Sequence, residues 1–220
     1  MKKLSFIITV LIFAITAQGQ TLDNEFYFRF GYSSPSWKQF DGTEQDWKDE
    51  GFNYKFGGSF DVGTIFMIQS IPAAENMALG INVDYVYFNY SQFYNSRDFS
   101  NQNLAHLQFG SKIGPSFSYS PGQRMAFDVY AKANIAWMSG AVYFEDGVDN
   151  ADDFYFAKPT VGFSGGLNIR YSVLMIGIEF ETISPKLESD DNPGTYLGNI
   201  NSDSEKSSLP CVNFSFGFSF

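Results

Sequence analysis

Few side chains in this sequence could act as a nucleophile or carry a proton. His106 is the only histidine and Cys211 the only cysteine, so no internal disulfide can form. Hydrolytic or acyl-transfer chemistry at His106 would also need a serine and a carboxylate within hydrogen-bond reach. No motif supplies such partners, and a lone cysteine is usually a small, buried, unreactive residue. The sequence therefore predicts no catalytic residue.

One acidic segment could bind a hard cation. Asp146, Asp149, Asp152 and Asp153 lie within residues 145–158, and carboxylate oxygens are ligands that Ca²⁺ prefers. Their spacing lacks the Asp-x-Asp-x-Asp-Gly order and the final Glu of an EF-hand loop. A solvated acidic loop is the simpler interpretation. The sequence therefore predicts neither a metal nor a cofactor.

Most other charges occupy alternate positions of apolar segments. Successive side chains of a strand point to opposite faces, so these charges share one face with Gly, Ser and Asn. That face carries the predicted interior polar network, which comprises Glu25, Arg29, Lys55, Asp61, Asp84, His106, Lys112, Asp128, Lys132, Arg170, Glu179 and Glu181. Six acids against five bases suit a paired structural network, with proton or ion conduction as the functional alternative. A symmetric turn at residues 120–123 would place Lys112 opposite Lys132.

The alternation recurs in eight segments, which are predicted to be strands at residues 25–33, 53–68, 77–90, 103–119, 125–144, 160–171, 174–182 and 212–220. Long polar connections follow every odd-numbered segment, and shorter ones follow the second, fourth and sixth. This asymmetry is typical of barrels with short periplasmic turns and long extracellular loops. The predicted fold is all-β, an eight-stranded antiparallel up-and-down transmembrane β-barrel.

The composition favours lipid rather than water outside this barrel. Aromatic residues make up 19% of the chain and charged residues 17%, against about 25% charged in a typical soluble domain. A soluble, lipocalin-like barrel is the alternative, but its outer face should be rich in charge. Aromatic residues near the strand ends predict two girdles: Tyr54, Tyr87 and Trp137 at one edge, and Phe66, Phe117, Tyr119, Tyr171 and Phe218 at the other.

The first residues have the pattern of an export signal. Two lysines precede an apolar run over residues 4–17, and Ala17-x-Gly19 suits cleavage near residue 19. Residues 1–19 are then a signal peptide, and residues 20–220 form one barrel domain in the outer membrane of a Gram-negative cell envelope. Loss of Lys2 and Lys3 changes the formal net charge from −10 to −12. Nucleic acid is excluded as a partner because there is no basic face.

In these features the chain resembles the small eight-stranded bacterial outer-membrane barrels of the outer membrane β-barrel domain family. The resemblance covers the signal peptide, the eight alternating strands and a terminal strand ending in Phe220. Residues 112–121 and 127–132 also look like the fourth hairpin of family members with uncharacterised or secretion-linked roles. The resemblance implies that Phe220 belongs to an assembly signal read by the barrel-assembly machinery.

The predicted function is that of an integral, non-enzymatic outer-membrane barrel with a structural or surface-interaction role. Its interior is expected to be polar and filled by side chains, and its extracellular loops acidic. The expected partners are outer-membrane lipid, the barrel-assembly machinery and a protein contacted through the extracellular loops. Two alternatives stay open: an accessory component of an outer-membrane secretion or surface-assembly system, and a rim-site lipid-modifying enzyme that uses His106.

Overall fold

The computed structural model describes residues 22–35, 52–68, 76–95, 102–122, 124–144, 153–183, 187–189 and 209–220. These residues form nine strands: β1 (Glu25–Pro35), β2 (Phe52–Met67), β3 (Met77–Asn95), β4 (Gln102–Gly122), β5 (Met125–Phe144), β6 (Asp153–Tyr171), β7 (Leu174–Ile183), β8 (Leu187–Ser189) and β9 (Leu209–Ser219). The part of the chain so described contains no helix long and apolar enough to cross a membrane. The predicted export signal, most of the long connections, and Asp146, Asp149 and Asp152 lie outside the described residues.

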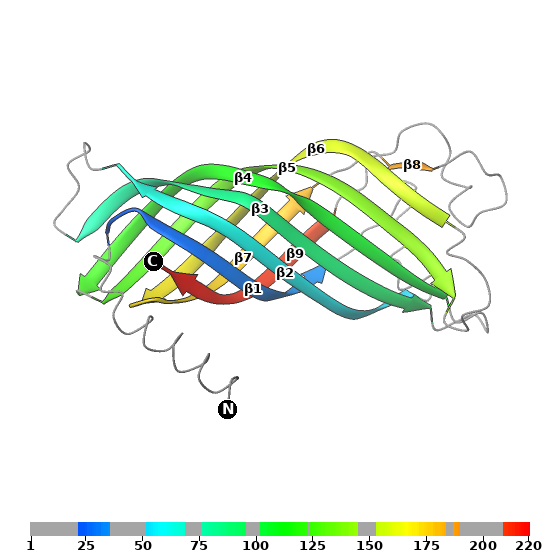
Figure 1. Ribbon diagram of the computed structural model, residues 1–220, viewed down its shortest axis with the longest axis horizontal. Coiled ribbons are helices and arrows are strands. Elements are labelled where there is room, and N and C mark those ends of the chain that lie inside the picture. Colours follow the sequence, from blue (N-terminus) through cyan, green and yellow to red (C-terminus); the bar gives the residue numbers. More distant parts are fainter. Residues whose placement is uncertain are drawn as a thin grey trace, which may run out of the picture.

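Eight of these strands close into an antiparallel barrel (Figure 1). Each of β1 to β6 pairs with the next strand in the chain, and β9 pairs with both β7 and β1. The closing ladder between β1 and β9 runs from Pro35↔Cys211 to Tyr27↔Ser219. Beyond it, the backbone amides of Phe26 and Phe220 each donate to the other's carbonyl oxygen, at 3.0 and 2.8 Å. The predicted eight-stranded up-and-down fold is confirmed.

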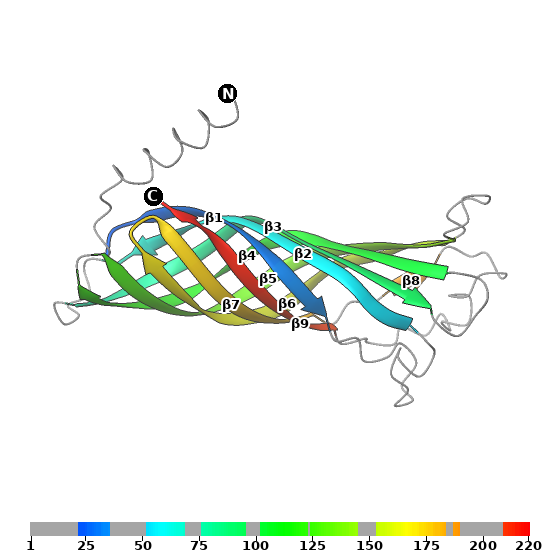
Figure 2. The ribbon, with the colours of Figure 1, turned by 90° about the horizontal axis from the view of Figure 1, so that it is seen from below.

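The strands differ greatly in length. β3, β4, β5 and β6 have 19, 21, 20 and 19 residues, whereas about 9–11 residues suffice for a tilted strand to cross a bilayer. β1, β7 and β9 have only 11, 10 and 11. The long strands therefore project at one end, opposite the end where the chain terminates (Figures 1 and 2). Long connections leave from that projecting end, so it is the extracellular end.

The projecting end contains one element that the sequence did not predict. The short strand β8 pairs with Tyr155–Ala157 of β6. Because β6 begins at Asp153, the predicted connection over residues 145–158 is shorter than expected, and its last residues are strand.

The two faces of the wall have opposite character. Phe163 and Ile176, on the outside, are 65% and 59% exposed, whereas the interior residues Arg29 and Asp84 are 1% and 0% exposed. Exposed and buried side chains alternate along β7 almost without interruption. An apolar outside with buried charges inside is the reverse of a water-soluble barrel, and suits a closed sheet surrounded by lipid. The lipocalin-like alternative is therefore excluded.

Two β-bulges change which residues face the interior. In β2, Lys55 is an extra residue between the pairs Tyr54↔Phe93 and Phe56↔Gln92, and its side chain is exposed. The prediction that Lys55 belongs to the interior network is therefore wrong. In β3, an extra residue between Asp84 and Tyr87 turns Tyr87 inward, where it is fully buried, so its predicted place in the outer girdle is also wrong. A single inserted residue reverses the alternation of every residue beyond it.

The bulge in β3 lies on the lipid-facing wall and is closed by a side chain. Ser111 lies on the outer face of β4, and its hydroxyl donates a hydrogen bond of 2.7 Å to the carbonyl oxygen of Tyr85. In lipid, a backbone group that leaves the ladder has no water to replace its partner. This requirement explains a serine on an otherwise apolar face.

Candidate functional site in the barrel interior

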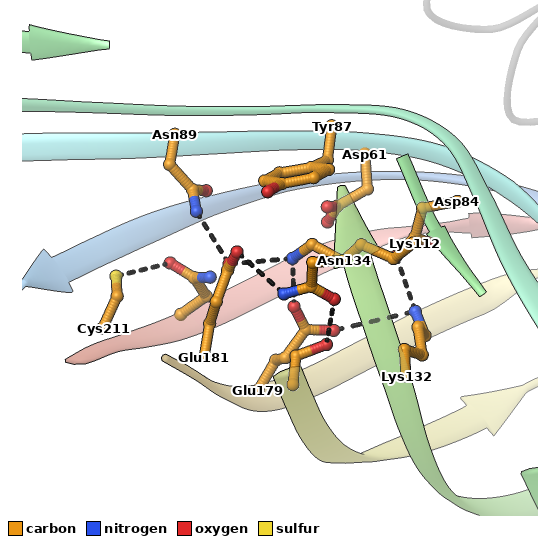
Figure 3. Close-up of polar contacts among 12 residues, drawn as sticks. Asp61, Asp84, Tyr87, Asn89, Lys112, Lys132, Asn134, Glu179, Glu181 and Cys211 are labelled. Atoms are coloured by element: carbon orange, nitrogen blue, oxygen red, sulfur yellow. Dashed lines mark hydrogen bonds and ion pairs between the residues drawn. The ribbon is translucent and has the colours of Figure 1, made fainter. Parts of the chain in front are cut away.

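Seven charged side chains meet in the middle of the barrel and are here called the central cluster. Its members are Arg29 of β1, Asp61 of β2, Asp84 of β3, Lys112 of β4, Lys132 of β5, and Glu179 and Glu181 of β7. Each occupies an inward position, and all are more than nine-tenths buried. Figure 3 shows how the lysines and the acids from opposite walls point toward one another.

Arg29 extends from β1 across the interior. Its Nη2 lies 3.2 Å from Asp61 Oδ2 on the neighbouring strand. Its Nη1 donates to Tyr130 Oη at 3.2 Å and to Asn168 Oδ1 at 3.1 Å, on β5 and β6 of the far wall. The guanidinium group therefore lies across the barrel axis, and its planar set of donors links β1 to β2, β5 and β6.

Each lysine of the cluster is bound by acids from another strand. Lys112 Nζ lies 2.5 Å from Glu179 Oε1 and 2.9 Å from Glu181 Oε2. Lys132 Nζ lies 2.6 Å from Asp84 Oδ2. The two lysines do not face each other as a symmetric turn would require. The β4–β5 hairpin is irregular between Tyr119 and Gly122, and its register places Lys112 opposite Asn134.

The carboxylate of Glu181 accepts hydrogen bonds from side chains of three strands, β3, β4 and β5 (Figure 3). Its Oε1 accepts from Gln108 Nε2 at 2.6 Å and Asn134 Nδ2 at 3.0 Å, and its Oε2 accepts from Asn89 Nδ2 at 3.0 Å as well as from Lys112. Four donors satisfy a buried carboxylate without a second full positive charge. The charge-based prediction omitted these three amides, although all occupy the same inward positions as the charged residues.

A second cluster lies toward the periplasmic end. Arg170 donates to Asp128 through Nε at 2.7 Å and through Nη2 at 2.8 Å, and it also pairs with Glu25. The hydroxyl of Ser118 donates to the same aspartate at 2.6 Å. Beside it lies an apolar cluster formed by Tyr27, Ile65, Met67 and Met175. Ile65 lies opposite Glu25, and Met175 lies opposite Arg170.

Three inward tyrosines each lie opposite a glycine on the next strand. The register pairs Tyr27 with Gly63, Tyr87 with Gly110 and Tyr130 with Gly166. A β-carbon at Gly166 would lie 2.5 Å from Tyr130 Oη, so the ring occupies the space that a side chain would need. Gly63 and Gly166 therefore make room for a tyrosine ring, whereas a β-carbon at Gly110 would meet the backbone of β5.

His106 and Cys211 do not form a recognisable catalytic group. His106 is 4% exposed and lies opposite Ser91 of β3 and Gly140 of β5. The buried Sγ of Cys211 lies 2.9 Å from Ser33 Oγ and donates to Asn213 Oδ1 at 3.3 Å. Within the described ranges, no group of three or more His, Cys, Asp or Glu side chains could hold a metal ion.

Phe220, the proposed assembly signal, lies directly after β9. Its backbone extends the closing ladder to Phe26, and its ring is 48% exposed on the outer face. The rings of Phe28, Phe218 and Phe220 gather there, with centroids of Phe28 and Phe218 5.4 Å apart and those of Phe28 and Phe220 6.0 Å apart. The end of the chain thus presents a phenylalanine surface where the barrel closes.

A closed antiparallel barrel that is apolar outside and charged inside defines an integral outer-membrane β-barrel protein. No protein-family model and no curated protein matches the sequence. Among solved structures, the chain is similar to the attachment invasion locus protein Ail of Yersinia pestis, with 10% identity over 90% of this chain and 99% of that one and a TM-score of 0.46. It is also similar to a major outer membrane protein from Thermus thermophilus (12% identity, 90% and 99% coverage, TM-score 0.47) and to the outer membrane protease OmpT from Escherichia coli (14%, 92% and 98%, 0.45). Likeness at this level carries no inference about function.

Proposed function

We propose that this protein is a non-conducting structural barrel of the outer membrane that presents its extracellular loops to a partner. The observation that carries the proposal is Arg29, whose guanidinium group reaches Asp61 on one wall and Tyr130 and Asn168 on the other. A side chain that bridges the axis and is 1% exposed leaves no aqueous path around itself. Eight strands enclose only enough space for side chains to fill.

Purified protein in planar bilayers is expected to show no steady, uniform conductance steps. The central cluster and the Arg170 cluster would both have to separate before ions could pass, and each separation exposes a buried charge. Protein refolded to the same yield but carrying Arg29→Ala is the matched control, because it removes the bridging side chain. Reproducible single-channel openings in the wild type, with ion selectivity altered by Lys132→Glu, would show that the interior is a path.

The extracellular end supports a surface-interaction role. β3 to β6 extend beyond the membrane at this end, and residues 34–50, 145–158 and 184–207 carry ten of the twelve net negative charges of the mature chain. A partner with a basic face would be attracted to such loops. An accessory role in secretion or surface assembly is one form that this contact could take.

Phe220→Asp is expected to reduce insertion into the outer membrane sharply. The change places a charge on the lipid-facing side of the closing strand and removes the terminal aromatic residue that we propose the barrel-assembly machinery reads. Heat-modifiable migration of membrane fractions in detergent gels measures the folded yield. Phe220→Leu is the control for recognition, since it keeps the apolar surface but not the ring. Wild-type yield of Phe220→Asp would contradict the proposal.

We further propose that the protein is not an enzyme. The side chains of His106 and Ser91 are buried inside the barrel and present no surface to a lipid substrate. His106→Ala is therefore expected to leave both the folded yield and the acylation pattern of lipid A unchanged, as measured by mass spectrometry of extracted lipid. A reproducible change in acylation in this variant, absent from Cys211→Ala, would favour the rim-site enzyme instead.

A further inference from the structure

We propose that the pairing of β4 with β5 has a weak point at Pro115. We also propose that the ion pair of Lys132 with Asp84, here called the staple, holds β5 to β3 on the inner side of this weak point. The β4–β5 register is unshifted from Gln102↔Phe144 to Tyr119↔Phe127, yet no rung forms at Gly114 and Pro115. On the other side of β4, both residues are paired with β3. Proline has no N–H, so β4 offers no donor to β5 at this point.

The interrupted rung lies in the lipid-facing band. Ile113 and Phe117, the outward neighbours of Pro115 on β4, are both exposed and apolar. A carbonyl that loses its ladder partner in lipid has no water to replace it. At the β3 bulge, Ser111 supplies the missing donor. At Pro115 the outward residues on the adjoining strands are Ile81 and Val83 of β3 and Ala131 and Ala133 of β5, and none has a polar side chain.

Two other prolines within strands, Pro159 and Pro210, do not interrupt a ladder in this way. Pro159 of β6 lies in a bulge, where the register to β5 shifts between Ala136 and Met138. Pro210 of β9 pairs with Thr182, and the ladder continues on both sides of it. Both lie in the extracellular part of their strands. Pro115 combines an unshifted register with a missing donor inside the membrane.

Lys132 lies directly behind this interruption. The register aligns it with Gly114, and its side chain points inward, where Nζ lies 2.6 Å from Asp84 Oδ2. Asp84 belongs to β3, so the ion pair joins β5 to β3 across the inner surface of β4. The absence of a side chain at Gly114 leaves room for this crossing. A β-carbon at that position would collide with the carbonyl oxygen of Ala131 and lie 2.7 Å from the Cα of Lys132. Separation of β4 from β5 therefore requires this ion pair to break.

Amide hydrogen exchange of the full chain in lipid nanodiscs, followed by NMR, tests the weak point. The amides of Ala131 and Ala133 are expected to exchange about tenfold faster than those of Leu167 and Ile178, a complete rung of the β6–β7 seam, because about one hydrogen bond is missing. Pro115→Ala restores the donor and is expected to remove the difference. Pro210→Ala, at a complete ladder, is the matched control and should change neither seam. Equal exchange at the two seams in the wild type, or no effect of Pro115→Ala, would overturn the weak point.

Lys132→Met tests the staple. It is expected to accelerate exchange at Ala131 and Ala133 more than at Leu167 and Ile178. If that variant does not fold, Asp84→Asn provides the same test with a side chain that still accepts hydrogen bonds. Equal acceleration at both seams would show that Lys132 stabilises the whole barrel without closing this seam, and would overturn its role as a staple.

Discussion

Arg29→Met is expected to lower the free energy of unfolding by about 3–5 kcal/mol, the usual cost of removing one partner from a buried ion pair. The loss removes the cation that lies 3.2 Å from Asp61 and withdraws the hydrogen bonds that Tyr130 and Asn168 accept. Four acids of the central cluster would then face two lysines. Urea-induced unfolding in lipid vesicles, followed by tryptophan fluorescence, measures the change.

Three companion variants show whether the cause is buried charge. Arg29→Lys keeps the charge but not the planar set of donors, so its loss should be intermediate. Arg29→Met combined with Asp61→Asn removes the unpaired acid and should recover part of the stability. Lys55→Met alters a cation that is exposed at the bulge, so its effect should stay within about 0.5 kcal/mol. An equal loss in Arg29→Met and Lys55→Met would contradict the assignment of Arg29 as the bridging residue.

The adjacent glycines of β6 are expected to respond in opposite ways to the same substitution. Gly166→Ala should cost about 1–3 kcal/mol, the range for overpacking, because the new β-carbon would lie 2.5 Å from the carbonyl oxygen of Ile178 and from Tyr130 Oη. Tyr130 cannot turn away freely, since its hydroxyl accepts from Arg29. Gly165→Ala should be neutral or stabilising by about 0.5–1 kcal/mol, because the nearest atom to its β-carbon is the carbonyl oxygen of Tyr130 at 3.5 Å.

The same unfolding assay distinguishes the two positions. The variants differ by one place in the sequence and carry the same added methyl group, so strand propensity cancels between them. A second comparison, Gly166→Ala in a Tyr130→Phe background, removes the hydroxyl that the new β-carbon meets but leaves the Ile178 carbonyl. Equal stability of the two single variants would contradict the packing of Tyr130 over Gly166.

The strands and their two faces were predictable because each face repeats one kind of residue over many strands. The terminal segment shows this most clearly, since Phe214, Phe216 and the terminal Phe220 face lipid as expected. The alternation of apolar and polar residues does not reveal where a bulge inserts an extra residue, so Lys55 and Tyr87 were assigned to the wrong faces. Both errors begin at a bulge, where the partner strand decides which residue is left out of the ladder.

The partners inside the barrel were less predictable than its members. The alternation along each strand identifies the charged residues that face the interior. Which acid contacts which lysine depends instead on the register of the hairpins and on the tilt of the strands. Lys112 was expected opposite Lys132 and instead lies opposite Asn134, because the turn between β4 and β5 is not symmetric. Its acids, Glu179 and Glu181, come from β7, which no local feature of the β4–β5 hairpin could indicate.

The span of Arg29 also has a consequence for the order of events during assembly. Arg29 belongs to the first strand, while its far contacts, Tyr130 and Asn168, belong to strands that arrive 101 and 139 residues later. Until β5 and β6 are in place, this guanidinium group has Asp61 of β2 beside it but lacks both far contacts, and Lys112 lacks its two glutamates until β7 is added. The interior network of ion pairs is therefore complete only after the late strands of the chain have joined the early ones.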